Sequence, residues 1–181
     1  MAQLGLPSIN IVFKELGTSA IERGESGVIA LVLKKTTATV PEILNVYSAT
    51  SIPADVETKH KQLINYCLIG STKSVKKVVV VFAKDTVEGV NALNNTDYNY
   101  LVTPYATSEE YGEVISIVGN LRDNGKMVKY VVANKSADKP YVINFTTGGI
   151  IVDGASVSTA EFTCRIAGIL ASVPLSMSAT Y

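Results

Sequence analysis

Apolar residues alternate with polar ones in some stretches of the chain and recur every three to four residues in others, which predicts a mixture of strands and helices. The first alternating stretch is SINIVFKE, residues 8–15, in which Ile9, Ile11 and Phe13 fall on one side. This is the pattern of a half-buried strand. The charged, glycine-containing segment GTSAIERG that follows is typical of a link rather than of a hairpin turn. The sequence therefore leaves open what this strand pairs with.

Continuous apolar runs predict strands that are more deeply buried. GVIALVLKK at residues 27–35 and VKKVVVVFAK at residues 75–84 are such runs, and the β-branched content of the second is expected of a strand covered on both faces. Between these two runs, Pro41 and Pro53 break any long element, so we expect turns there. Further strands are predicted at residues 98–104, 126–133, 141–145 and 150–152.

Two helices are predicted in the first half of the chain. Residues 55–70 have helical periodicity, and Gly70 is expected to end that helix. A short helix is expected over residues 86–95, with Thr86 as its cap and Glu88 just inside it. The residues that share the apolar face of the first helix are Val56, Leu63, Tyr66, Cys67 and Ile69.

The two later helices have clearer signals. TSEEYGEVISIVGNLRDNG begins with Thr107 or Ser108 as a cap, continues with two glutamates that favour the positive end of a helix, and ends at Gly125. VSTAEFTCRIAGILASV begins at Ser158 or Thr159, and Pro174 closes it. The apolar stripe of the earlier helix consists of Tyr111, Val114, Ile115, Val118 and Leu121.

Strands and helices alternate with short connections from residue 75 onward. Such alternation implies parallel strands with helices packed on the sheet. We therefore predict the α/β class, with a mixed, largely parallel sheet, flanking helices and an extended N-terminal β arm.

Composition narrows the classes of function. The chain has 181 residues and a formal net charge of zero, which argues weakly against binding to nucleic acid or to an anionic membrane through bulk charge. The first residues lack the basic head and apolar run of a secretory signal, and no apolar stretch reaches the ~18 residues of a membrane span. Cys67 and Cys164 fall in predicted helices; we expect buried free thiols and a reducing compartment.

The residue types that carry catalysis or metal binding are sparse. His60 is the single histidine and lies among charged residues, so we expect it on a solvated helix face. One histidine and two separated cysteines do not make a zinc site. GSTKS at residues 70–74 lacks the spacing of a phosphate loop, and TTGGIIVDG at residues 146–154 is better explained by a tight turn. The aspartates near element ends are expected to form turns; they are Asp85, Asp97, Asp123, Asp138 and Asp153.

Long stretches of the sequence resemble one protein family. LPSINIVFKE, TSAIERGESGVIALVLK and VSTAEFTCRIAGILASVPLSMSATY are similar to contractile tail sheath proteins of phages, prophage-derived particles and R-type bacteriocins of Gram-positive bacteria. The region DYNYLVTP…LRDNGK…YVVAN…ADKPYVINFT resembles the middle domain of those sheaths. The resemblance implies an arm and tether at residues 1–20, the N-terminal part of the sheath core at 21–95 and an α/β middle domain at 96–181. Sheaths of this family usually continue further, so a C-terminal polymerisation region is expected beyond this point.

The resemblance implies a structural, non-enzymatic role without cofactors or metals. Sheath subunits polymerise around an inner tube, and a trigger at the baseplate makes the sheath contract and drive the tube through a cell envelope. The implied partners are other sheath subunits, the tube protein and the baseplate, with no nucleic acid and no membrane. The implied location is the bacterial cytoplasm during assembly, and then a phage tail or phage-like particle released on lysis.

The resemblance also suggests a partner for the first strand. Neighbouring sheath subunits exchange terminal strands, so Ile9, Ile11, Val12 and Phe13 would contact a neighbour's sheet by strand addition. Gly17 and Gly24 would be the hinges of the tether. The alternative is that the strand adds to an edge of its own domain.

Two other functions remain as alternatives. A small α/β enzyme or ligand-binding domain would place its site at the carboxyl ends of the strands, near Pro104 and Asn134. A type VI secretion sheath would use the same physical principle, although the N-terminal sequence is more similar to phage-type sheaths.

Overall fold

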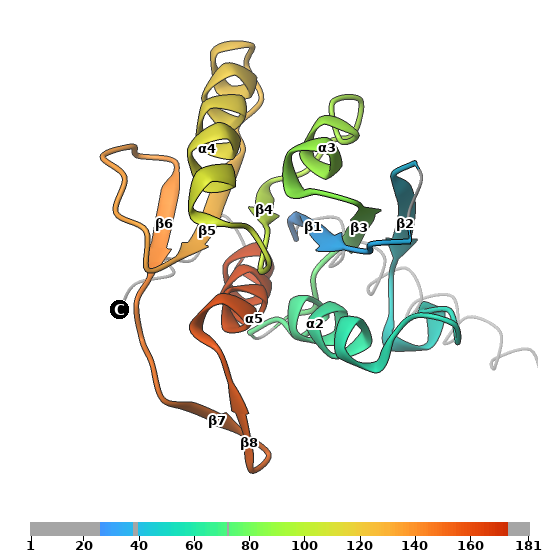
Figure 1. Ribbon diagram of the computed structural model, residues 1–181. Coiled ribbons are helices and arrows are strands. Elements are labelled where there is room, and N and C mark those ends of the chain that lie inside the picture. The colour runs from blue at the N-terminus through green and yellow to red at the C-terminus, as the bar shows by residue number, and fades with distance from the viewer. Residues whose placement is uncertain (1–25, 38–39, 72, 174–181) are drawn as a thin grey trace, which may run out of the picture.

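The computed structural model describes residues 26–37, 40–71 and 73–173, which form a six-stranded sheet with helices on both faces (Figure 1). The strand order is β2-β3-β1-β4-β5-β6, and every pairing except β2 with β3 is parallel. The strands are β1 Val28–Lys34, β2 Glu42–Val46, β3 Lys77–Ala83, β4 Tyr100–Val102, β5 Lys129–Ala133 and β6 Val142–Phe145. The prediction of a mixed, largely parallel α/β sheet is confirmed, whereas the N-terminal arm lies outside the described residues.

The centre of the sheet is a pair of long parallel strands, β1 and β3. Ile29 is paired with Val78 and Leu31 with Val80, and all four side chains are fully buried. Both strands are covered on both faces, which is why their sequences are continuous apolar runs rather than alternating ones. The neighbouring strands β2 and β4 pair with this central pair, so it sets the position of the β2 edge.

Each face of the sheet has its own core and its own pair of helices. The helices α2 Thr58–Leu68 and α5 Thr159–Ser172 cover the face that includes Leu31 and Leu33. The opposite face, which includes Ala30 and Val32, is covered by α3 Thr86–Asn91 and α4 Ser108–Asp123. Within the described ranges, no helix is long and apolar enough to cross a membrane.

Local sequence signals explain most of the helix boundaries. Thr107 caps α4 and Ser158 caps α5, each in a reciprocal box with the glutamate three residues later. Gly125, with φ of +86°, follows the end of α4 as expected. The cap of α3 is Asp85 rather than Thr86, because the Asp85 carboxylate accepts a 2.7 Å hydrogen bond from the amide of Glu88. That one expected cap was wrong by one residue.

Two strands, β2 and Ala155–Val157 (β8), were not predicted. The segment around Pro41 and Pro53, expected to be rich in turns, holds β2 and a short 3-10 helix, η1 Ala49–Ser51. The strand at Ile150–Val152 (β7) does not continue from β6; it pairs with Ala155–Val157 (β8) in a separate hairpin that projects from the body (Figure 1). The tight turn expected within residues 146–154 lies at Asp153 and Gly154, which both have positive φ, as does Gly149 before β7.

The sheet draws its strands from both sides of residue 95. β1 pairs with β3 on one side and with β4 on the other, and α5 packs on β1, β4 and β5, which come from both sides of residue 95. The expected division between residues 95 and 96 therefore falls in the loop that leads into β4, between two adjacent parts of one sheet.

Candidate assembly surfaces

The edge of the sheet at β2 exposes apolar side chains. Ile43 is 48% exposed, and the residues flanking the strand, Val40 and Tyr47, are 68% and 54% exposed. Among the described residues β2 is the last strand of the sheet on this side, so its outer main-chain groups face away from β3. A strand edge of this kind is a template for pairing with another segment.

A pocket of about 300 Å³ lies beside this edge, on the face covered by α2. Its floor is apolar and its rim is charged, with three carboxylates and one lysine. The residues that line it are Lys35, Glu42, Ile43, Leu44, Pro53, Asp55, Val56, Glu57, His60 and Phe82. This combination of an open strand edge and an adjacent side-chain pocket is the geometry used in strand addition.

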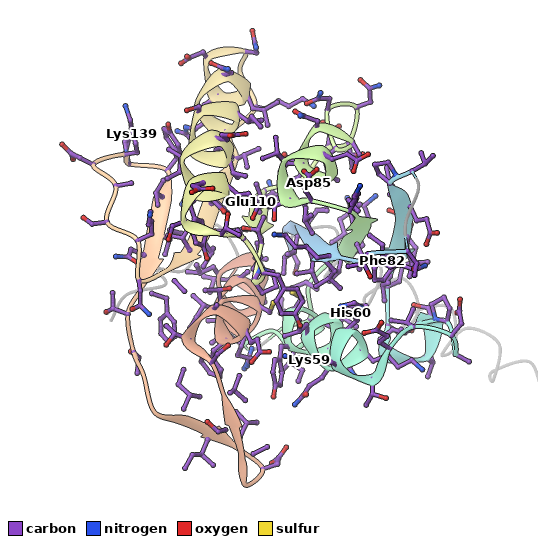
Figure 2. All side chains as sticks on the ribbon, in the orientation of Figure 1. Lys59, His60, Phe82, Asp85, Glu110 and Lys139 are labelled. Atoms are coloured by element: carbon purple, nitrogen blue, oxygen red, sulfur yellow. The ribbon has the colours of Figure 1, made fainter. Side chains whose placement is uncertain are left out.

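His60 lies at the base of that pocket and is only 7% exposed. Its ring packs at 5.7 Å from the Phe82 ring and 6.0 Å from the Tyr105 ring, and Figure 2 shows His60 between α2 and the end of β3. Burial lowers the pKa of His60 below its usual value, although Glu57, with Oε2 3.9 Å from Nδ1, opposes the shift. The expectation of a solvated histidine was wrong, because the rings of Phe82 and Tyr105 cover His60 even though Glu57 lies beside it.

Glu110 connects three elements at the carboxyl end of β1. Its carboxylate lies 2.8 Å from the Lys34 ammonium and accepts hydrogen bonds from the backbone amides of Thr86 (3.1 Å) and Thr107 (2.6 Å). Burial raises the pKa of Glu110, but these hydrogen bonds outweigh it and hold the pKa at about 2. Figure 2 shows Glu110 and Asp85 at neighbouring helix starts. The perturbed pKa thus has a structural cause, the joining of α3, α4 and β1.

Just after β4, near the place where a ligand site was the alternative expectation, one pair of buried hydroxyls is hydrogen-bonded. The hydroxyls of Thr103 and Tyr130 lie 2.5 Å apart, and both residues are buried. Pro104 is buried behind them, and Asn134 turns the chain with φ of 52°. Burial raises the pKa of Tyr130 well above its usual value, so this hydroxyl stays neutral.

An open hollow of about 690 Å³ lies at the amino ends of the parallel strands, the end of the sheet opposite to Glu110. Lys76, Lys126 and Lys129 line it, together with Ser26 and Val173 at the two ends of the described chain. The amide of Gly27 donates a 2.7 Å hydrogen bond to the carbonyl of Ala171. Both ends of the described body therefore leave it at the same place.

The cysteines and two of the aspartates considered in the sequence occupy structural positions. Cys67 and Cys164 are buried free thiols, as predicted, and burial raises the pKa of Cys164 well above its usual value. No group of three or more histidine, cysteine, aspartate or glutamate side chains that could hold a metal occurs among residues 26–37, 40–71 and 73–173. Asp153 is a turn residue with positive φ, and Asp85 is a cap.

The arm residues singled out in the sequence lie outside the described residues; they are Ile9, Ile11, Val12, Phe13, Gly17 and Gly24. The surface at β2 was missed at the sequence level. Its signal is weak, because EILNV is short, follows Pro41 and has only Leu44 and Val46 on its inner face.

The described body thus combines an apolar strand edge at β2 with two ends, Ser26 and Val173, that lie at one place. Residues 80–181 match the phage tail sheath protein central domain family. The chain is also 35% identical over 186 residues to the tail sheath protein of Clostridium phage phiCD119, covering 98% of this chain and 51% of that protein. The chain belongs to the phage tail sheath protein family and spans about half the length of this curated relative.

Solved structures confirm the fold. The sheath tail protein Lin1278 from Listeria innocua superposes with a TM-score of 0.70 at 15% identity, over 94% of this chain and 62% of that one. The sheath tail protein DSY3957 from Desulfitobacterium hafniense gives a TM-score of 0.69 at 13% identity, over 100% of this chain and 64% of that one. At these identities the likeness concerns the fold alone.

Proposed function

We propose that the chain forms part of a structural subunit of a contractile tail sheath, which polymerises around an inner tube and contracts to drive it through a target envelope. The observation that carries this proposal is the 35% identity to a phage tail sheath protein along nearly the whole of this chain. The role requires no catalytic residue and no cofactor. The partners are other sheath subunits, the tube protein and the baseplate.

The same proposal places the protein in the bacterial cytoplasm during assembly and then in a released phage tail or phage-like particle. A formal net charge of zero suits close packing of identical subunits, since no net repulsion between copies has to be overcome. Partners of high charge density, such as nucleic acid or an anionic membrane, are not part of this function.

The N-terminal arm supplies the link between subunits in this proposal. Ile9, Ile11, Val12 and Phe13 pair with the sheet of a neighbouring copy in the assembled sheath, and Gly17 and Gly24 absorb the change of direction when the sheath contracts. The proposal divides the subunit into the arm and tether at residues 1–20, a first part of the core at 21–95 and a middle domain at 96–181.

The described body supports the role of a rigid unit. The capped helices, the two-sided core and the Glu110 contacts fix its elements relative to one another. A rigid body with flexible links lets a lattice change its spacing while each subunit keeps its fold. Contraction then requires only a small difference in free energy per subunit, summed over many subunits.

Negative-stain electron microscopy tests the proposal directly. The full-length gene product, overexpressed alone, is expected to form long hollow tubes, and removal of residues 1–20 is expected to abolish them. Chain 1–181 is imaged in parallel, to show whether this part of the subunit assembles without the length that the curated relative has in addition. Monodisperse full-length particles, with a folded circular dichroism spectrum, would contradict a sheath role.

A further inference from the structure

We propose that, in the unassembled chain, residues 8–15 add as a seventh strand to the β2 edge of their own sheet and seat apolar side chains in the pocket beside His60. The inference rests on the proposed function only in that the same arm later serves as the link between subunits. The proposal names the surface that would receive residues 8–15, which lie outside the described residues. It makes those residues the occupant of the β2 edge in the free chain.

The β2 edge exposes apolar side chains that another segment could bury. Three of the large apolar side chains that the described body exposes, Val40, Ile43 and Tyr47, lie on or beside this one strand. The other edge strand, β6, is flanked by the polar segment 134–140, from which the Lys135 amide donates a 2.9 Å hydrogen bond to the Asn144 side chain. An apolar edge without such protection pairs readily with an available strand.

The pattern of the arm matches both sides of this edge. Leu44 and the pocket lie on the face covered by α2, and a strand with Ile9, Ile11 and Phe13 on one side would place those side chains there. The other side of the arm has one apolar residue, Val12, and the other side of β2 has one, Ile43. Because side chains alternate along a strand, a single alignment satisfies both faces.

The tether is long enough for the arm to reach its own edge. Ser26 lies just before β1, and the β1–β3–β2 register places Ile29 level with Val46, so the chain enters at the level where β2 ends. A strand outside β2 is three strand spacings from β1, or about 14 Å at about 4.8 Å each. Residues 16–25 span up to about 33 Å when extended. The shortest path from Ser26 would place Glu15, the last residue of the arm, level with Val46, the last residue of β2. The arm would then run in the same direction as β2.

Charge along this route is complementary. Residues 16–25 carry two glutamates, Glu22 and Glu25, and one arginine, Arg23, and they would cross the start of β3, where Lys76 and Lys77 lie. Lys77 already reaches across to β2, where its ammonium lies 3.2 Å from the Asn45 side-chain oxygen. Since an attached segment has a high effective concentration, the chain's own arm reaches this edge before that of another molecule.

Hydrogen exchange of the β2 amides tests this docking on chain 1–181. The double variant Ile11→Asp/Phe13→Asp places two charges on the side of the arm that would face the pocket. We expect β2 amides to exchange at least about tenfold faster in this variant than in the parent chain. The control Ser8→Asp/Asn10→Asp adds the same two charges to the other side of the same strand, and we expect it to leave β2 protection unchanged.

The measurement is repeated over a hundredfold range of protein concentration, with the molecular mass followed by light scattering. Protection that is independent of concentration in a monomer supports docking of the chain's own arm. Equal exchange rates of the β2 amides in the parent chain and both variants would contradict the docking. Protection that appears only when the chain is a dimer would show that the arm comes from another molecule. Neither result affects the tube assay, which tests the sheath role separately.

Discussion

His60 is the buried titratable residue whose charge changes nearest to neutral pH. Its pKa is lowered because burial between Phe82 and Tyr105 penalises the charged ring. The charged groups around it are Glu57 on the same helix, which favours protonation, and Lys59 and Lys35, which oppose it; Glu42 and Asp55 line the same pocket. In the unfolded chain the ring takes up a proton near its ordinary pKa of about 6.5.

We therefore expect the free energy of unfolding to fall as the pH drops from 7.5 to 5, since the unfolded state binds a proton at His60 that the folded state binds only at lower pH. Thermal unfolding at several pH values measures this slope. The variant His60→Phe keeps an aromatic ring in the cavity and should flatten the slope over that range. An unchanged slope in the variant would assign the effect to other groups.

Glu110 gives a second prediction at the residue scale, in a different pH range. Because its pKa is about 2 in the folded protein and 4.5 for a free glutamate side chain, its contribution is complete above pH 4.5 and is lost as the pH falls towards 2. Glu110→Gln removes the carboxylate that joins Lys34 to two helix starts, and we expect a loss of about 1–3 kcal/mol at pH 7. Denaturant unfolding measures it, with exposed Glu113→Gln as the control on the same helix.

At the scale of elements, the contact between α2 and α5 depends on one small residue. A Cβ added at Gly168 would lie 2.7–2.8 Å from the carbonyl oxygens of Ile69, Cys67 and Tyr66. Arg165 lies one turn earlier on α5 and donates to the carbonyls of Ile69 and Gly70, so this helix also caps the end of α2. The close approach leaves no room for a side chain.

Gly168→Ala should therefore destabilise the protein by roughly 1–3 kcal/mol through overpacking, despite the better helix propensity of alanine. Gly112→Ala on α4 is the matched control, because a Cβ there meets nothing within 4 Å. That change should stabilise by about 0.5–1 kcal/mol. Chemical denaturation of both variants gives the comparison, and a shift of the same sign in both would contradict the role assigned to Gly168.

The elements that sequence reasoning predicted are those with strong local signals. β1 and β3 are continuous apolar runs, and α4 and α5 begin with capping boxes. β2 was missed because its strand conformation comes from pairing with β3, which is distant in the sequence. β8 was not predicted; the hairpin that it forms with β7 turns at Asp153–Gly154, where both residues have positive φ.

The candidate site was less accessible to sequence reasoning than the fold. Burial of His60 depends on Phe82 and Tyr105, which lie far from it along the chain, and Ile69 was expected on the buried face but is 51% exposed at the end of α2. The pocket beside β2 combines residues from β2, α2 and β3, from the position after β1 and from the segment before α2. A surface that is assembled from such separated segments has no local pattern by which it could be recognised.

At the scale of the whole molecule, the described body has continuous packing on both sides of residue 95. β1 lies between β3 and β4, and α5, near the end of the described chain, packs on the face that includes Leu31. Removal of α5 would expose Cys67, Leu63 and the inner face of β1 together. The two segments at residues 26–95 and 96–173 thus share one core on each side of the sheet.

We therefore expect chain 1–181 to unfold in one cooperative transition, because neither segment buries its apolar face without the other. Differential scanning calorimetry should give a single peak whose calorimetric and van't Hoff enthalpies agree. Circular dichroism of the helices and tyrosine fluorescence should report the same midpoint, since the buried tyrosines include Tyr66 on α2 in the first segment and Tyr130 on β5 in the second. Two separate transitions would instead show that the division near residue 95 separates independently folding units, and the sheath core would then consist of two bodies that could move during contraction.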